Sequence, residues 1–378
     1  MDSPYKRELE VAIRVVEQAA RLSLAVLPNQ DKGAIEKVDA SSEHESNLGP
    51  VTIGDFAIQA LLTSSLHAAF PTDSFVGEED ASALRDNAVL RQRVWETLQQ
   101  TVVPDPEKDT EKDIVLPASA DDMCDMIDRC QNAPGAGRVW VFDPIDGTKT
   151  FLRREMFAIN VALVVDGQQT VAVVACPLLS PEPPTESLSQ VTIQNDSIDP
   201  SGRGSLLYAV RGHGAYVRPL SDAAGPGVAR RLQDCGTTRL LRPVTCDFMQ
   251  DSALDGVHRA VAARLGVAYP GSDLLGWVPR WAALATGWAN TTVWVYKRRD
   301  RHAKVWDHAG AMLLFEEVGG RITDVDGKPI DLLAGRKLKG NFGFVAAPAD
   351  VHGIVLAAVR DVLQEQGRGD LLGEPKEQ

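Results

Sequence analysis

The stretch Val139-Trp140-Val141-Phe142-Asp143-Pro144-Ile145-Asp146-Gly147-Thr148-Lys149-Thr150-Phe151 decides how the chain folds and where its chemistry lies. Its apolar start is typical of a buried strand, and Pro144 and Gly147 predict a turn behind that strand. Asp143 and Asp146 flank the proline, which fixes its own φ, so both carboxylates and the Ile145 carbonyl can face one point. Such oxygen ligands suit a hard cation such as Mg²⁺. The alternative interpretation is an ordinary strand-end turn rich in Asp, Pro and Gly.

Gly147 and the residues after it add a second feature to this stretch. Glycine lets the backbone approach a ligand closely, and successive N–H groups behind it can hold an anion. Gly147, Thr148 and Lys149 are therefore the expected contacts of a bound phosphate.

Length, composition and charge bound the class of protein. The 378 residues suit two domains or one large layered domain. Hydrophobic residues make up 44% and charged residues 24%, ordinary values for a globular protein. The net charge of −13 argues against a nucleic acid polymer or an anionic membrane as partner.

Cysteine usage and the N-terminal residues predict a cytoplasmic protein. The five cysteines show no Cys-x-x-Cys pair and no zinc-ligand spacing, which indicates reduced thiols. The charged N-terminus does not resemble a signal peptide, and no apolar run approaches the roughly 18 residues that span a bilayer.

Hydrophobic periodicity divides the chain into helical and extended segments. It predicts a helix that ends near Pro28, a second helix with Asp55 in its first turn, a helix over 81–103, a helix capped by Ser119, and a helix from Asp307 to Gly319. The runs 157–165 and 170–176 predict a hairpin. We expect an α+β domain over 1–204 that carries most metal ligands and an α/β domain over 205–378 that carries Asp307 and the specificity residues. The polar segments 40–49 and 104–113 are expected insertions.

Three further acidic motifs accompany the first stretch. They are Val51-Thr52-Ile53-Gly54-Asp55, Phe75-Val76-Gly77-Glu78-Glu79-Asp80 and Val305-Trp306-Asp307-His308-Ala309-Gly310. In this order, the four motifs resemble the metal sites of the inositol monophosphatase superfamily, most closely those of the eukaryotic 3′(2′),5′-bisphosphate nucleotidases. The resemblance runs from about Tyr5 to about Val359. It implies the α/β class with a layered α/β/α/β/α arrangement.

The resemblance also implies which residues hold two or three Mg²⁺ ions. The first ion would be bound by Glu78, Asp143 and the Ile145 carbonyl, the second by Asp143, Asp146 and Asp307, and a third by Glu78 and Asp55. The attacking water would be oriented by Thr148 Oγ1, which Asp55 would hold. Glu79 is interpreted as an acid behind these ligands, because Mg²⁺ takes few ligands from protein. Read without the resemblance, Asp55 and Asp307 could serve only as helix-capping acids.

The specificity residues follow the family pattern less closely. Ser272 follows Gly271 as expected, the next basic residue is Arg280, and Lys304 keeps its place before the third motif. These three residues are the expected contacts of a second phosphate. The basic run Lys297 to Lys304 could also be a solvated charge cluster.

The predicted function is a Mg²⁺-dependent, lithium-sensitive phosphomonoesterase that converts 3′-phosphoadenosine 5′-phosphate to AMP and phosphate, with PAPS as a second candidate substrate. One alternative is a phosphatase of inositol phosphates or another small phosphorylated metabolite on the same metal site. Another is a non-catalytic phosphate-binding protein, which would not need the water-positioning pair Asp55 and Thr148. The expected partner is a small phosphorylated molecule, and the expected state is a monomer or weak homodimer.

Overall fold

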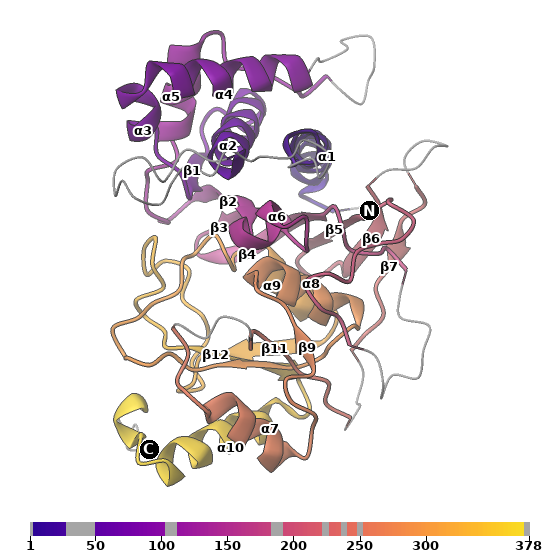
Figure 1. Cartoon of the computed structure of the whole chain (residues 1–378), viewed down its shortest axis with the longest axis vertical. Coiled ribbons are helices and arrows are strands. Elements are labelled where there is room, and N and C mark those ends of the chain that lie inside the picture. The colour runs from indigo at the N-terminus through magenta and orange to yellow at the C-terminus, as the bar shows by residue number, and fades with distance from the viewer. Residues whose placement is uncertain are drawn as a thin grey trace.

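The computed structural model describes residues 3–27, 50–102, 112–182, 192–220, 227–235, 240–247 and 252–373. The expected insertion at 40–49 lies outside these residues, and so does nearly all of the one at 104–113. Five layers alternate between helices and sheets, which confirms the predicted α/β/α/β/α arrangement (Figure 1).

A seven-stranded sheet forms the first β layer, with the strands in chain order. The strands are β1 (Ser74–Gly77), β2 (Arg138–Asp146), β3 (Ala158–Val165), β4 (Gln168–Cys176), β5 (Ser205–Val210), β6 (Ala215–Pro219) and β7 (Arg230–Arg231). Among the described strands of this sheet, β1 and β2 pair parallel and the other neighbours pair antiparallel. The predicted domain division near residue 204 falls inside this sheet, because β5 pairs with β4 and carries the sheet on to Arg231.

The strand β2 separates two hydrophobic cores by the alternation of its side chains. Trp140 and Phe142 point into the core that contains α1 (Lys6–Val26) and α2 (Pro50–Ala69), whereas Val139 and Val141 point into the core of the C-terminal half. A strand buried on both faces has no solvent-exposed face that would favour polar side chains, which explains its continuous apolar sequence.

The helices and the second sheet complete the layers (Figure 1). Beside α2 lie α3 (Ser82–Asp86), α4 (Ala88–Thr101) and α5 (Ala120–Asp128); the short α6 (Thr148–Leu152) follows β2. The middle layer contains α8 (Trp277–Thr286) and α9 (Ala311–Glu316). Beyond it, β10 (Thr292–Trp294), β12 (Phe344–Pro348) and β11 (Gly320–Thr323) form a sheet in that order, covered by α7 (Val257–Leu265) and α10 (His352–Glu365). The remaining elements are the pair β8 (Val244–Thr245) and β9 (Ser272–Asp273) and the 3₁₀ helix η1 (Gly369–Leu371).

Several predicted element bounds need correction. The helix expected over 81–103 is broken at Asn87, whose side chain accepts a hydrogen bond from Leu90 N and caps α4. The helix α2 begins at Pro50, so Asp55 lies beyond its first turn. The helix expected from Asp307 begins only at Ala311, so Asp307 lies in the turn that precedes α9. The predicted helix start at Ser119 is confirmed, since its Oγ accepts from Asp122 N. None of the described helices meets the length and apolarity needed to span a membrane.

Candidate metal centre and active site

The parallel pairing of β1 and β2 brings the first two predicted ligands together. Gly77 pairs with Phe142, so Glu78 and Asp143 leave the same edge of the sheet side by side. Burial raises the pKa of Glu78, and the nearby Lys304 charge and then the adjacent Asp143 side chain oppose that rise.

Asp143 lies at the centre of an acidic cluster, which we define as Asp55, Glu78, Glu79, Asp143, Asp146 and Asp307. Its side chain is buried, and its Oδ1 has no hydrogen-bond partner among the described residues. Burial raises the pKa of Asp143 far above its usual value, and four other members of the cluster raise it further: Glu78, Asp146, Asp307 and Asp55. The predicted metal ligands therefore converge from four segments that are far apart in the sequence.

Asp146 connects the centre to the middle helical layer. Its Oδ2 accepts a hydrogen bond from Val278 N in the first turn of α8. The approach is close, because a Cβ on Gly276 would lie 3.0 Å from the same oxygen. Burial raises the pKa of Asp146 to about 7, and the bond from Val278 and the nearby Arg280 guanidinium oppose that rise. The carboxylate thus anchors α8 against the end of β2.

The helix α2 brings Asp55 to the centre through a close helix–strand contact. A Cβ on Gly54 would lie 3.0 Å from Ile145 Cδ1, so the helix packs directly on the turn after Asp143. Burial raises the pKa of Asp55 well above its usual value, and Glu79 and then Glu78 raise it further. Glu79, which we interpreted as lying behind the ligands, has its pKa raised to about 7 by burial and by its acidic neighbours Glu78 and Asp80.

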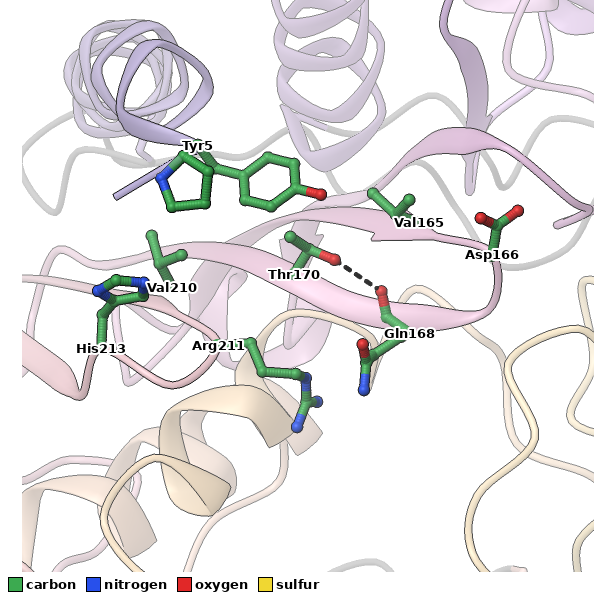
Figure 2. A pocket seen from close by; sticks show the side chains of 9 residues that line it. Tyr5, Val165, Asp166, Gln168, Thr170, Val210, Arg211 and His213 are labelled. Atoms are coloured by element: carbon green, nitrogen blue, oxygen red, sulfur yellow. Dashed lines mark hydrogen bonds between the residues drawn. The ribbon is translucent and has the colours of Figure 1, made fainter. Parts of the chain in front are cut away.

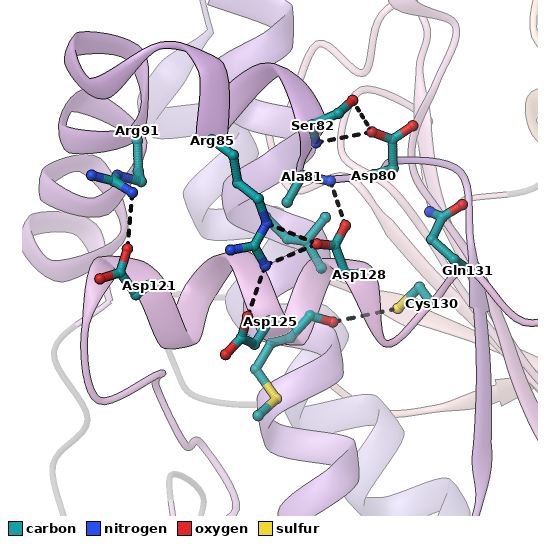
Figure 3. A network of polar contacts seen from close by, with 12 residues as sticks. Asp80, Ala81, Ser82, Arg85, Arg91, Asp121, Asp125, Asp128, Cys130 and Gln131 are labelled. Carbon is teal, nitrogen blue, oxygen red and sulfur yellow. Dashed lines mark hydrogen bonds and ion pairs between the residues drawn. The ribbon is translucent and has the colours of Figure 1, made fainter.

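The segment that carries Glu78 and Glu79 is anchored to α5 (Figure 3). Asp128 Oδ1 accepts a hydrogen bond from Ala81 N at 2.7 Å. Its other oxygen accepts two bonds from the Arg85 guanidinium, which also contacts Asp125. These ion pairs are exposed and contribute little stability individually, whereas the bond from Ala81 N ties the chain after β1 to α5.

Asn160 positions the turn that contains Asp307. It lies opposite Asp143 on β3, is fully buried, and donates from Nδ2 to the Trp306 carbonyl at 2.6 Å. Gly310 packs on the same side chain, since a Cβ there would lie 2.3 Å from Asn160 Oδ1. We did not identify Asn160 from the sequence; its only signal is one amide in the apolar run Ala158–Val165.

The chemistry of the acidic cluster fits Mg²⁺. Every donor is a hard oxygen, and the orphaned Asp143 Oδ1 and the mutually raised pKa values indicate uncompensated negative charge. In the described ranges, however, no group of three His, Cys, Asp or Glu side chains already forms a metal-binding arrangement.

Thr148 and Asp55 do not form the predicted pair directly. Thr148 is exposed at the start of α6, whereas Asp55 is buried in α2. Within the described residues no hydrogen bond joins the Thr148 hydroxyl to the Asp55 carboxyl. Gly147 precedes Thr148 with a φ of +95°, a left-handed conformation that favours glycine and turns the chain into α6. Lys149 is exposed on that helix.

Ser272 and Arg280 are buried in the C-terminal half. The Ser272 hydroxyl accepts a hydrogen bond from Ile193 N at 3.0 Å and so ties two loops together. The Arg280 guanidinium donates to the carbonyls of Leu274 and Leu275. It lies between two indole rings, 4.3 Å from Trp277 and 4.7 Å from Trp294. Its Nη1 is buried and has no hydrogen-bond partner within the described ranges.

Lys304, predicted as a contact of the second phosphate, lies beside the acidic cluster. Its Nζ is 4.7 Å from the centre of the Trp306 ring, and its charge lowers the pKa of Glu78, Glu79 and Asp307. In contrast, Lys297 pairs with Asp255 and is partly exposed, as expected for a solvated charge.

A separate pocket of about 360 Å³ lies near the start of α1 and contains none of the predicted site residues (Figure 2). Its cation, Arg211, already donates to the Gln169 carbonyl and forms an ion pair with Glu316. The Arg211 guanidinium is therefore already occupied by protein groups and is not free to bind a phosphate in this pocket.

Comparison with known proteins gives a consistent result. Residues 6–364 match the model of the inositol monophosphatase family. A 3′(2′),5′-bisphosphate nucleotidase of Emericella nidulans is 33% identical over 362 residues, covering 95% of this chain and 99% of the relative. One from Schizosaccharomyces pombe is 33% identical over 360 residues, covering 95% and 96%.

Solved structures show the same fold. An inositol monophosphatase from Zymomonas mobilis gives a TM-score of 0.56 at 16% identity, covering 95% of this chain and 99% of that one. Inositol monophosphatase II from Staphylococcus aureus gives 0.55 at 17% identity, covering 96% of both chains. The motif order, the converging acids and these matches lead to one conclusion: the chain belongs to the inositol monophosphatase family.

Proposed function

We propose that this chain is a Mg²⁺-dependent phosphatase that converts 3′-phosphoadenosine 5′-phosphate to AMP and phosphate, with PAPS as a second candidate substrate. The observation that carries the proposal is the convergence of Asp55, Glu78, Asp146 and Asp307 on the buried Asp143. The bisphosphate substrate is supported by the full-length relatives, which are named as bisphosphate nucleotidases.

The residues of the acidic cluster and its neighbours have different proposed roles in hydrolysis. Glu78, Asp143, the Ile145 carbonyl, Asp146 and Asp307 would hold two Mg²⁺ ions, with Asp143 shared between them; Asp55 and Glu78 would hold a weaker third. Bound Mg²⁺ supplies an activated water and neutralises the charge of the phosphate. Thr148 would orient the water, with Asp55 acting on it from α2. Lys304 adds positive charge beside Glu78 and Asp307 and so favours the dianionic substrate.

The second phosphate needs its own cationic contacts. A phosphate dianion placed against the C-terminal half loses water, which costs several kcal/mol unless charged donors replace it. The unpartnered Arg280 Nη1 and the Lys304 ammonium are the groups proposed for this role, with the Ser272 hydroxyl as a weaker donor. Gly147, Thr148 and Lys149 would contact the phosphate that is hydrolysed.

The alternative is a phosphatase of inositol phosphates or another small metabolite on the same metals. It is consistent with the solved structures named above, but those are 16–17% identical and support the fold alone. A cytoplasmic location and a monomeric or weakly dimeric state complete the proposal.

Substrate discrimination tests the proposal. Lys304→Ala and Arg280→Lys should each raise KM for adenosine 3′,5′-bisphosphate by about tenfold or more, because each removes or misplaces one charge-assisted contact. Hydrolysis of inositol 1-phosphate, which lacks the second phosphate, should change much less in Arg280→Lys. In Lys304→Ala it should also slow, but by less than hydrolysis of the bisphosphate, because Lys304 lies beside the acidic cluster. Lys297→Ala is the matched control, since Lys297 pairs with Asp255 at the surface. If neither variant alters the ratio of kcat/KM values for the two substrates, the nucleotidase assignment fails and the metabolite phosphatase replaces it.

A further inference from the structure

Arg336 is a basic residue that the proposed chemistry does not use. It lies between β11 and β12, in a segment that pairs with residues 303–305 through its backbone. Val305 N donates to the Arg336 carbonyl at 3.0 Å, and Leu338 N donates to the Ala303 carbonyl at 3.0 Å. These bonds fix Arg336 beside the strand-like segment that leads directly into Trp306 and Asp307.

The Arg336 side chain crosses from this segment to the edge of the first sheet. Its Nη2 donates to the Gly77 carbonyl at 2.6 Å and contacts the Glu78 carbonyl at 3.4 Å. Its Nη1 donates to the Cys130 carbonyl at 2.8 Å and contacts the Asn132 carbonyl at 3.3 Å. All four acceptors are main-chain oxygens, so the guanidinium fixes the backbone where β1 ends.

The same guanidinium lies 4.7 Å from the centre of the Trp306 ring. One planar group therefore contacts the peptide that carries Glu78 and the residue that precedes Asp307. Among the described residues Arg336 forms no salt bridge with a carboxylate. Its half-buried guanidinium donates to main-chain carbonyls instead. A lysine ammonium could not reproduce this flat, forked contact.

A buried glutamine holds the other side of the same peptide. Gln59 in α2 accepts from Glu79 N at 2.9 Å and donates to the Glu79 carbonyl at 2.7 Å. A Cβ on Gly77 would lie 2.6 Å from Gln59 Oε1, so the chain leaving β1 runs closely against that amide. Arg336 from the C-terminal half and Gln59 from the N-terminal half thus fix the segment Gly77–Glu79 from two directions.

We propose that Arg336 is a positioning residue that sets the spacing between the Glu78 and Asp307 halves of the metal centre. This inference rests on the proposed function, since it assigns Arg336 to the same Mg²⁺ site. Both acids lie on segments whose relative position depends on the contact between the two halves of the chain. Without the guanidinium, the peptide at Glu78 loses its contact with the Trp306 turn. Part of the free energy of Mg²⁺ binding would then be needed to order the two halves, so the Mg²⁺ affinity would fall.

The test compares Arg336→Lys and Arg336→Met with the matched control Arg299→Lys. Arg299 also donates to a carbonyl, that of Leu371 at 2.7 Å, and its guanidinium lies 4.8 Å from the Phe342 ring. Its ion pair is with Asp326, outside the acidic cluster. Arg299→Lys therefore removes another half-buried guanidinium that contacts a carbonyl and an aromatic ring, in the same half of the protein, without touching the proposed metal ligands.

Two readouts separate positioning from simple stabilisation. Calorimetric titration of substrate-free protein with Mg²⁺ measures binding directly, and the Mg²⁺ dependence of phosphate release gives the half-saturating concentration. Both Arg336 variants should weaken Mg²⁺ binding by about 10- to 100-fold, the usual effect of removing a group that orients metal ligands. At saturating Mg²⁺, kcat should return to within about threefold of wild type, because the ligands themselves are intact. Arg299→Lys should lower Tm and leave both Mg²⁺ readouts unchanged.

Unchanged Mg²⁺ binding in both Arg336 variants, with Tm lowered as in Arg299→Lys, would overturn the inference and leave the proposed function standing. A wild-type protein that shows no Mg²⁺ uptake and no Mg²⁺-dependent phosphate release would instead overturn the proposed function, and the inference with it.

Discussion

Replacing Asp143 with Asn removes one negative charge from the acidic cluster and keeps the shape of the side chain. Asp143 is buried, and four other acids raise its pKa. Two unit charges in a partly buried site interact by about 2–4 kcal/mol at an effective dielectric constant of about 20. Because part of the cluster holds protons without metal, we expect a net gain of about 2 kcal/mol in the metal-free protein, or roughly 4 °C in Tm for a chain of this size.

The same change should remove activity. Asp143 is the ligand proposed to be shared by both ions, so Asp143→Asn should lower kcat by at least about a hundredfold, or about 2.7 kcal/mol of barrier. The assay combines phosphate release at saturating Mg²⁺ with thermal unfolding at pH 8 in EDTA and in Mg²⁺. In EDTA the variant should be more stable than wild type, and in Mg²⁺ the order should reverse, because wild type gains more from binding.

Asp121→Asn is the control, since Asp121 forms an exposed ion pair with Arg91 outside the cluster. It should leave kcat unchanged and shift Tm by no more than about 2 °C in either buffer. An Asp143→Asn protein that keeps more than about a tenth of wild-type kcat would refute the shared-ligand role. Equal Tm values in EDTA at pH 8 would refute the repulsion on which the stability estimate depends.

Three further predictions follow from the same contacts. The pKa values of Glu79 and Asp146, both about 7 in the folded chain, exceed those of the unfolded chain. The free energy of unfolding without metal should therefore fall as pH rises from about 4 to about 7. Thermal unfolding in EDTA across this range measures this change, and a Tm that does not vary with pH would contradict the prediction. Li⁺ at roughly tens of millimolar should inhibit phosphate release by occupying a Mg²⁺ position with half the charge, and undiminished activity would count against the site. Asp73→Ala should cost about 2–4 kcal/mol of unfolding free energy, because the buried Trp140 indole N–H loses its acceptor; urea unfolding measures it, and a loss below about 1 kcal/mol would show that water replaces Asp73.

The sequence was most informative where local pattern determines structure. The apolar run before Asp143 predicted β2, because a strand buried on both faces has no polar alternation. Ser119 predicted the start of α5 by its capping chemistry. The order of the four acidic motifs predicted the cluster through their resemblance to a known family, and the parallel pairing of β1 and β2 places Glu78 beside Asp143.

Contacts between distant segments had no local signal. Arg336 donates to the Gly77 carbonyl across 259 positions of sequence, and no periodicity marks either residue. In the sequence, nothing distinguishes Arg280 from an ordinary exposed basic residue. In the structure it is buried between Trp277 and Trp294, because α8 packs onto the second sheet. The helix α9 starts only at Ala311, and Asn160 holds the Trp306 carbonyl in the turn before it, a contact between distant segments that the sequence does not mark.

The most direct test of the central claim compares two substrates on the wild-type protein. Phosphate release from 3′-phosphoadenosine 5′-phosphate and from inositol 1-phosphate is measured at saturating Mg²⁺, with kcat/KM determined for each. Two charge-assisted contacts to the second phosphate, worth about 1.5–3 kcal/mol each, predict a kcat/KM at least about 100-fold higher for the bisphosphate. An equal or higher value for inositol 1-phosphate would contradict the account.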